Sequence, residues 1–281
     1  MGVDHYENFP VASVLCPPRL RPAIAAIYHF ARTADDIADE GDAPCAERLG
    51  DLVAFRDDLA AIYAGAAPSA RWQPIFAALN ASRLSHQLPL RLLEDLLDAF
   101  EQDVHNPPYQ DRQQLLNYCR LSANPVGRLL LHLYGVSNAA ALAQSDAICT
   151  ALQLINFWQD LGVDALRGRV YAPIEDLHRR GLAVDDLRSG CDDARTRGLV
   201  RELCQWADAL MRSGAPLALK IPGRGGWELR LVVQGGLRIL AKIAAMEYRT
   251  LSRRPTLGLA DAPLMLWQAL CMPRAYGGVG A

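Results

Sequence analysis

The sequence predicts an all-α protein folded as a single domain, and three observations support this prediction. Apolar residues recur with helical periodicity along nearly the whole chain, and no convincing run of alternating β-branched residues indicates a strand. Alanine, leucine and arginine are abundant, and all three are strong helix formers. No internal repeat and no low-complexity linker divides the chain. We therefore expect residues 1–281 to form one domain.

Proline and glycine clusters mark the ends of the predicted helices, because these residues interrupt helices and favour turns. The clusters lie at 41–44, 65–68, 106–108, 135 and 221–223. The predicted helices are 19–40, 45–64, 70–85, 90–105, 111–134, 139–165, 174–181, 193–213, 226–252 and 261–271. Pro125 falls inside the fifth of them. Since proline lacks an N–H donor and clashes with the preceding turn, we expect a kink or a break there.

The composition excludes several classes of function. The apolar fraction of 51% suits a large core, and a formal net charge of -2 gives no indication of nucleic-acid binding. No apolar run is long enough to span a membrane, and the start of the chain lacks the features of a signal peptide. Seven cysteines without a C-x-x-C pair are typical of reduced thiols. We expect a cytoplasmic protein, and a peripheral contact with the inner membrane stays open.

The predicted helix near 22–40 carries an unusual polar face. Its members recur at helical spacing and are Tyr28, Arg32, Asp35, Asp36 and Asp39. Three aspartates within five residues repel one another, and each like-charged pair four residues apart costs a helix roughly 0.2–0.5 kcal/mol. We therefore expect a cationic group close to this face.

A second polar stripe lies on the predicted helix over 148–166, which is apolar around most of its circumference. The stripe consists of Gln153, Asn156, Asp160 and Asp164. A helix of this kind is normally buried, and an unpaired buried carboxylate is strongly destabilising. The stripe is therefore expected to face a partner, a cavity or an ion.

Either stripe alone is also compatible with a solvated helix face, because at this composition chance gives about three acidic pairs four residues apart. Two such stripes on two largely apolar helices favour a shared ion. Carboxylate oxygens suit Mg²⁺, which often shares its ligands with phosphate groups. Zinc is not indicated, because no histidine or cysteine lies at ligand spacing and the HExxH motif is absent.

Three ordered stretches resemble the squalene/phytoene synthase family. They are ARTADDIAD at 31–39, YCRLSANPVG at 118–127, and QLINFWQDLGVD at 153–164 followed by RGRVYAP at 167–173. The resemblance covers about residues 6–251. It implies a helical bundle of the isoprenoid-synthase type, in which two aspartate-rich helices face each other across a central cavity. It also implies an enzyme whose substrate is an isoprenoid diphosphate.

The resemblance assigns roles to individual residues. Mg²⁺ would be bound by Asp35, Asp39, Asp160 and Asp164, with Asp36 as a weaker candidate. Arg32 would contact phosphate oxygens, and Arg169 and Tyr171 would close over the diphosphate. Gln153 and Asn156 would line the cavity, while Tyr28 and Tyr118 would flank the isoprenoid. Candidates for holding a reacting water are Asn156, Gln153, Asn124 and Gln159.

Departures from the common family pattern point to one branch. Gln159 stands before Asp160, Ala165 follows Asp164, and the middle stretch reads SANPVG. These features, together with YENFPVAS at 6–13 and VQGGLRIL at 233–240, resemble the hydroxysqualene synthases of bacterial hopanoid biosynthesis. That branch converts presqualene diphosphate to hydroxysqualene, so no NADPH is expected. Functional coupling to neighbouring enzymes of the squalene pathway is implied as well.

Two alternatives stay open at this point. A head-to-head prenyl synthase would make presqualene diphosphate, squalene or phytoene from two prenyl diphosphates. A non-catalytic family member would serve as an assembly factor, but its acidic motifs would be expected to erode. Here all four principal aspartates are present, so the catalytic alternatives are favoured.

Overall fold

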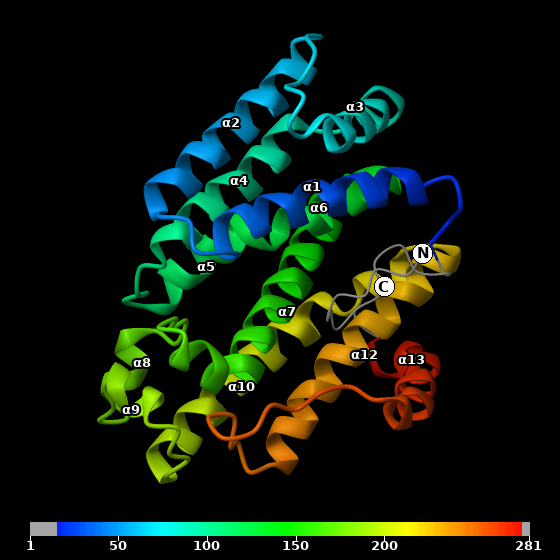
Figure 1. The fold of residues 1–281 in the computed structure, drawn as a ribbon. Helices are drawn as coiled ribbons and strands as arrows, with labels where there is room; N and C mark the ends of the chain where they lie inside the picture. The colour runs from blue at the N-terminus through cyan, green and yellow to red at the C-terminus, as the bar shows by residue number, and fades with distance from the viewer. Residues whose placement is uncertain (1–15, 277–281) are drawn as a thin grey trace. The chain divides into compact units, whose positions relative to one another are not determined.

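The computed structural model describes residues 16–276, and Figure 1 shows their helices in chain order. Within this range no residue belongs to a strand, which confirms the predicted all-α fold class. No helix among these residues has the length and apolar character needed to cross a bilayer. The chain divides into two compact units, which are described separately below. The expectation of one domain over the whole chain stays a prediction.

The N-terminal unit comprises residues 16–107 and 120–138 of the described chain. Its helices are α1 (Arg21–Asp39), α2 (Cys45–Tyr63), α3 (Gln73–His86), α4 (Leu90–His105) and α6 (Asn124–Leu133). Helix α1 packs against α2, α3 and α4, and rings from three helices meet in the core. Phe55 lies 5.3 Å from Phe30 and 4.7 Å from Phe76 between ring centroids, and all three are fully buried. Burial of this apolar side of α1 leaves its polar face directed away from the core.

The C-terminal unit comprises residues 108–119 and 139–276 of the described chain. It contains α7 (Ala139–Leu166), α8 (Ile174–Arg179), α9 (Val184–Arg188), α10 (Ala194–Gly214), α11 (Leu217–Lys220), α12 (Gly223–Ala245), a 3-10 turn at Leu259–Asp261 and α13 (Ala262–Tyr276). Helix α5 (Arg112–Ser122) belongs to this unit up to Cys119. The long helix α7 packs along α10 and also contacts α12, as Figure 1 shows. Helix α7 is therefore the central element of the unit.

Several predicted boundaries can be compared with the observed ones. The expected break at Pro125 is confirmed, because α5 ends at Ser122 and α6 begins at Asn124. The prediction for 226–252 was wrong at its end, since α12 stops at Ala245. The short helices α9 and α11 were not predicted, because four or five residues are too few to show helical periodicity.

Candidate functional site

The acidic face of α1 supplies its own cation. Arg32 forms ion pairs with Asp35 at 3.0 Å, with Asp36 at 2.6 Å and with Glu40 at 2.7 Å. These side chains are partly accessible, whereas Phe30, Ala34 and Ala38 on the other side of the helix are buried. The cationic group expected beside the three aspartates is therefore Arg32 itself. Glu40, the fourth acidic residue of the cluster, was not predicted.

The end of α1 is held by Arg48 from α2. The Arg48 guanidinium donates to the carbonyl oxygens of Ala38 at 2.7 Å and Ala43 at 2.9 Å, and also to that of Gly41. Gly41 has a φ of 80°, a left-handed conformation that glycine adopts without strain. Asp39 is the last residue of α1, so these contacts fix the position of the Asp39 backbone at the end of the helix.

The polar stripe of α7 is the accessible edge of an otherwise buried helix. Gln153, Asp160 and Asp164 are partly buried and Asn156 is exposed. Most of the residues between them are buried, namely Leu154, Ile155, Phe157, Trp158, Gln159 and Leu161, whereas Val163 is 40% exposed. The prediction of a buried helix with one polar edge is confirmed. The stripe presents only oxygen and amide groups, which can bind a hard cation or a polar ligand.

Asp160 is paired with an arginine that lies 94 residues further along the chain. Both Nε and Nη2 of Arg254 donate to the Asp160 carboxylate, with Nη2 at 3.1 Å from Oδ2. Such a bidentate pair fixes the plane of the carboxylate and balances its negative charge. Sequence reasoning missed Arg254, because no local spacing connects it to the stripe.

The segment that carries Arg254 is anchored tightly to its surroundings. Gln159 is fully buried and donates its side-chain amide to the carbonyl oxygen of Pro255 at 2.7 Å. The Asp192 carboxylate accepts from the backbone N–H groups of Leu251 and Ser252 at 3.2 and 3.1 Å. The Gln159 amide N–H therefore holds this backbone segment, and a role for Gln159 in holding the reacting water stays a prediction.

Gly162 allows the same segment to approach α7. A Cβ atom at this position would lie 2.7 Å from the carbonyl carbon of Leu251 and would collide with its oxygen. Because both groups belong to the backbone, neither can move aside cheaply. Gly162 is therefore required for the close contact that places Arg254 next to Asp160.

Asp164 has an unusual acidity. Burial raises the pKa of its carboxyl, the negative charge of Asp160 raises it further, and Arg167 and Arg254 partly offset both effects. The resulting pKa is about 7, compared with 3.8 for an ordinary aspartate. Asp160 and Asp164 are one helical turn apart, so a cation between them would relieve the repulsion.

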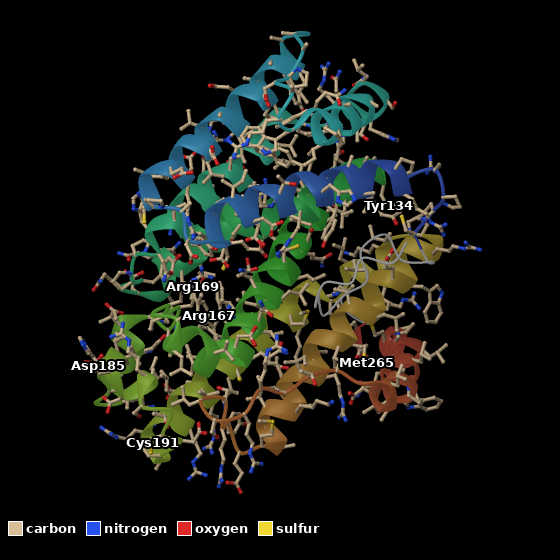
Figure 2. The ribbon with its side chains drawn as sticks, in the orientation of Figure 1. Tyr134, Arg167, Arg169, Asp185, Cys191 and Met265 are labelled. Atoms are coloured by element: carbon tan, nitrogen blue, oxygen red, sulfur yellow. The ribbon has the colours of Figure 1, made fainter. Side chains whose placement is uncertain are left out.

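The turn after α7 places two arginines beside this pair. Gly168 has a φ of 82°, and the backbone N–H groups of Arg167 and Arg169 both donate to the Asp164 carbonyl oxygen, at 3.0 and 2.9 Å. Figure 2 shows the two arginines close together where the chain leaves α7. The local structure therefore keeps Arg169 next to the acidic stripe. Arg167, which acts on the Asp164 pKa, was not among the predicted site residues.

An aromatic cluster adjoins the stripe within the C-terminal unit. Tyr171 stacks on Phe157 with ring centroids 3.8 Å apart and an interplanar angle of 7°. Tyr118 lies 6.3 Å from each of these rings, and Tyr109 lies 5.6 Å from Tyr118. All four side chains are buried. The Tyr171 ring is thus part of a packed aromatic wall, and its contact with a diphosphate stays a prediction.

Tyr28 and Asn124 belong to the N-terminal unit. Tyr28 is partly buried on α1 and meets His29 edge-to-face, with ring centroids 5.5 Å apart. Asn124 is 8% exposed and is the first residue of α6, directly after the break caused by Pro125. Their contacts with substrate stay predictions.

The donor set of the two acidic stretches fits Mg²⁺. Its oxygens are hard ligands, and burial together with the charge of Asp160 raises the pKa of Asp164, a cost that a bound cation would offset. Among residues 16–276, no group of three or more histidine, cysteine, aspartate or glutamate side chains forms a complete metal centre by itself.

Comparison with known proteins identifies the family. The family model for squalene/phytoene synthase matches residues 3–261. Hydroxysqualene synthase from Rhodopseudomonas palustris is 37% identical over 245 residues, which are 86% of this chain and 80% of the relative. Its counterpart from Zymomonas mobilis is 39% identical over 64% of this chain, and the match spans 59% of that relative.

Solved structures agree with this result. The crystal structure of squalene synthase HpnC from Alicyclobacillus acidocaldarius superposes with a TM-score of 0.79 at 35% identity, over 87% of this chain and 90% of the other. A dehydrosqualene synthase has the same TM-score at 21% identity, over 94% and 91% of the two chains, and shows the shared fold. From these matches, and from the acidic stretches on α1 and α7, the chain belongs to the squalene/phytoene synthase family.

Proposed function

We propose that this protein is a hydroxysqualene synthase that converts presqualene diphosphate and water to hydroxysqualene and diphosphate. Three relatives of that name are 34–39% identical to the chain. The observation that carries the proposal is the polar edge of α7, where Asn156, Asp160 and Asp164 lie on a buried apolar helix beside an aromatic cluster. It combines a binding edge for a charged diphosphate with an apolar surface for a hydrocarbon.

The carboxylates would hold the metal and the substrate would share it. We assign Asp35 and Asp39 on α1 and Asp160 and Asp164 on α7 as Mg²⁺ ligands. Asp36 is already engaged by Arg32 and is a weaker candidate. Bound Mg²⁺ would supply Lewis-acid stabilisation of the leaving diphosphate.

The arginines supply fixed positive charge where the leaving group becomes negative. The bond between carbon and the bridging oxygen breaks heterolytically, and the electron pair departs with the diphosphate. Guanidinium groups positioned before this step stabilise the developing charge, because their hydrogen bonds to phosphate oxygens need no reorganisation. We assign this role to Arg169, whose backbone N–H bonds to the Asp164 carbonyl oxygen, and to Arg32 beside Asp35 on α1.

The carbocation requires an apolar surface and then one water molecule. Tyr118 and Tyr171 offer π-faces that stabilise a cation by about 0.5–2 kcal/mol, and Tyr28 would flank the isoprenoid from α1. The water oxygen bonds to the rearranged carbocation and releases one proton, so no reductant such as NADPH enters the balance. We propose that Asn156, Gln153 or Asn124 holds this water.

The proposal includes contact with a lipid surface, because the substrate tail and the product are large hydrocarbons. On α13, Leu266, Trp267 and Leu270 are 50%, 63% and 58% exposed. Figure 2 shows this helix with Met265 labelled. Such an apolar face can lie in the interface of a bilayer without crossing it. We propose a protein of the cytoplasm that binds peripherally to the inner membrane and works beside other enzymes of the squalene pathway.

A product assay tests the main proposal. Purified protein is incubated with Mg²⁺ and presqualene diphosphate in the absence of NADPH, and a parallel reaction receives farnesyl diphosphate. Hydroxysqualene from the first reaction and no product from the second are expected. Condensation of farnesyl diphosphate would contradict the proposal and support a presqualene diphosphate synthase. That alternative is favoured by one observation, a presqualene diphosphate synthase from Rhodopseudomonas palustris that is 36% identical over 66% of this chain.

A further inference from the structure

An arginine-lined pocket lies in the C-terminal unit, outside the acidic stretches. Its volume is about 590 Å³. Its lining residues come from the first turns of α10, from the residue after α8 and from the end of α12 with the turn that follows it. The lining residues are Arg180, Ala194, Arg197, Gly198, Arg201, Ala244, Glu247 and Tyr248. None of them has a role in the proposed reaction.

The lining carries an excess of positive charge. Three arginines line the pocket and Glu247 is the one acidic residue in the lining. Glu247 is shared between Arg197 at 2.9 Å and Arg249 at 2.7 Å, and it cannot neutralise both. Arg201 instead lies over the ring of Tyr248, with its guanidinium carbon 5.0 Å from the ring centroid. In a chain with a net charge of -2, this concentration of arginine is a local feature.

The backbone makes room for these guanidinium groups. A Cβ atom on Gly198 would lie 2.9 Å from Nη1 of Arg180, so the glycine lets this side chain rest directly on α10. Arg180 also forms an ion pair with Glu202, which lies on α10 like Gly198. The position of one cationic wall of the pocket therefore depends on the absence of a side chain at residue 198.

The opposite wall adopts a conformation that is unfavourable for ordinary residues. Glu247 and Tyr248 have φ values of 54° and 63°, and neither is a glycine. Their backbone N–H groups bond to the carbonyl oxygens of Ala244 and Ile243, each at 2.9 Å, which holds the turn in place. Left-handed conformations of non-glycine residues cluster at binding sites, where the strain is maintained by the surrounding structure.

One donor in the pocket lacks an acceptor. The Nε atom of Arg197 is buried and has no hydrogen-bond partner among the described residues. Buried donors are almost always paired, so a partner for this one has to come from a group that binds in the pocket or from water. An oxyanion next to Arg197 would satisfy this donor and also balance the charge of Arg201.

We propose that this pocket binds a phosphate or diphosphate group, carried either by a small molecule or by a lipid headgroup. Planar guanidinium groups match the oxygens of phosphate with paired, charge-assisted hydrogen bonds. A volume of about 590 Å³ is within the usual range for small-molecule sites. The site is independent of the proposed reaction, since it uses none of the acidic residues assigned to Mg²⁺.

Calorimetric titration of the full chain with inorganic diphosphate, in the presence of a chelator, tests the proposal. Without Mg²⁺ the acidic stretches repel the anion, and we expect saturable binding at the arginine pocket. Arg201→Gln should weaken this binding by about tenfold or more, because it removes one charge-assisted contact. The matched control Arg188→Gln removes an arginine from an exposed pair with Asp185 in the same unit and should change affinity less than twofold.

Two further variants show whether the bound diphosphate occupies the arginine pocket. Asp164→Asn should retain the chelator-resistant binding, which separates this site from the acidic stripe. Arg201→Lys, which keeps the charge, should recover part of the affinity lost in Arg201→Gln. Absence of saturable binding, or an equal loss of affinity in the Arg188→Gln and Arg201→Gln variants, would overturn the proposal.

Vesicles distinguish the two sources of phosphate. The protein is mixed with phosphatidylcholine vesicles that contain phosphatidic acid, and with vesicles of phosphatidylcholine alone. Binding to the first kind that is lost in Arg201→Gln and displaced by inorganic diphosphate supports a lipid headgroup. Saturable binding of inorganic diphosphate without such vesicle binding supports a soluble phosphate-bearing ligand.

Discussion

The negative charges of the acidic stretches on α1 and α7 are compensated in different ways. On α1, Arg32 lies three and four residues before Asp35 and Asp36 and pairs with both. On α7, Asp160 is paired with Arg254, which lies 94 residues away, and the pKa of Asp164 is raised to about 7. The first stretch is balanced by its own helix, whereas the second depends on a distant segment. Local sequence therefore determines the electrostatics of α1, and tertiary packing determines those of α7.

The largest expected effect is a loss of turnover when an aspartate of either acidic stretch is replaced. Asp35→Asn and Asp160→Asn should each lower turnover of presqualene diphosphate by at least about 100-fold, because each removes a carboxylate that would hold the Mg²⁺ needed to stabilise the leaving diphosphate. The measurement is kcat at saturating Mg²⁺, with circular dichroism to verify the fold. Asp185→Asn, in the exposed pair with Arg188, serves as the control and should keep full activity. Near-normal kcat in both variants would remove the metal-ligand assignment.

A second prediction uses the raised pKa of Asp164. The folded protein holds this proton up to about pH 7, whereas the unfolded chain releases it near 3.8. Stability that is fully present below pH 3.8 is therefore lost as the pH rises through 7. In chelator, Asp164→Asn should be more stable than the parent protein at pH 8, by up to about 3 kcal/mol, and similar at pH 4. Urea unfolding at both pH values measures the difference, and a constant difference would contradict the assigned acidity.

Asp261 lies in the same unit and serves as a control, because its contribution to stability should depend on pH in the opposite direction. Its hydrogen bonds with Lys242, the backbone of Gly258 and Arg238 hold the pKa of this carboxyl well below its usual value, although the side chain is buried. Its contribution to stability is present above pH 3.8 and declines as the pH falls toward the lowered pKa. Asp261→Asn should therefore be less stable than the parent protein at pH 7, and the gap should narrow on acidification. A difference in unfolding free energy between Asp261→Asn and the parent protein that grows at low pH would contradict the lowered pKa.

A third prediction tests the close contact between α7 and the segment that carries Arg254. Gly162→Ala should destabilise the fold by about 1–3 kcal/mol, because the new methyl group collides with the backbone of Leu251. Gly50→Ala in α2 has open space around the new atom and should stabilise the protein by about 0.5–1 kcal/mol. Both are measured as changes in the urea midpoint. An equal response of the two variants would show that Gly162 is not needed for the close contact.

The smallest expected effect compares the two arginines directly. Arg254→Gln should cost about 1–2 kcal/mol of stability, since its partner Asp160 is mostly buried. Arg32→Gln should cost about 0.5–1 kcal/mol, since its partners on α1 are more accessible. The free energies of unfolding at pH 7 in chelator measure both. The reverse order would show that the local pair on α1 is the stronger one.

Much of the fold and part of the site could be predicted from local patterns. Helical periodicity identified α1 and α7, and the backbone chemistry of Pro125 predicted the break between α5 and α6. The stripes on both helices follow from side-chain spacing alone. The pairing of Arg254 with Asp160 and of Arg48 with the end of α1 could not be found this way, because these contacts join segments whose spacing carries no periodic signal.

The sequence by itself determined the helical fold class, the two acidic stripes and the family, because periodicity and short motifs are properties of neighbouring residues. Only the tertiary structure decided which cation balances Asp160, how strongly burial raises the pKa of Asp164, and where Arg180, Arg197 and Arg201 gather around a pocket. The physical reason is that charge pairing and desolvation depend on the groups that packing brings close, whatever their separation along the chain.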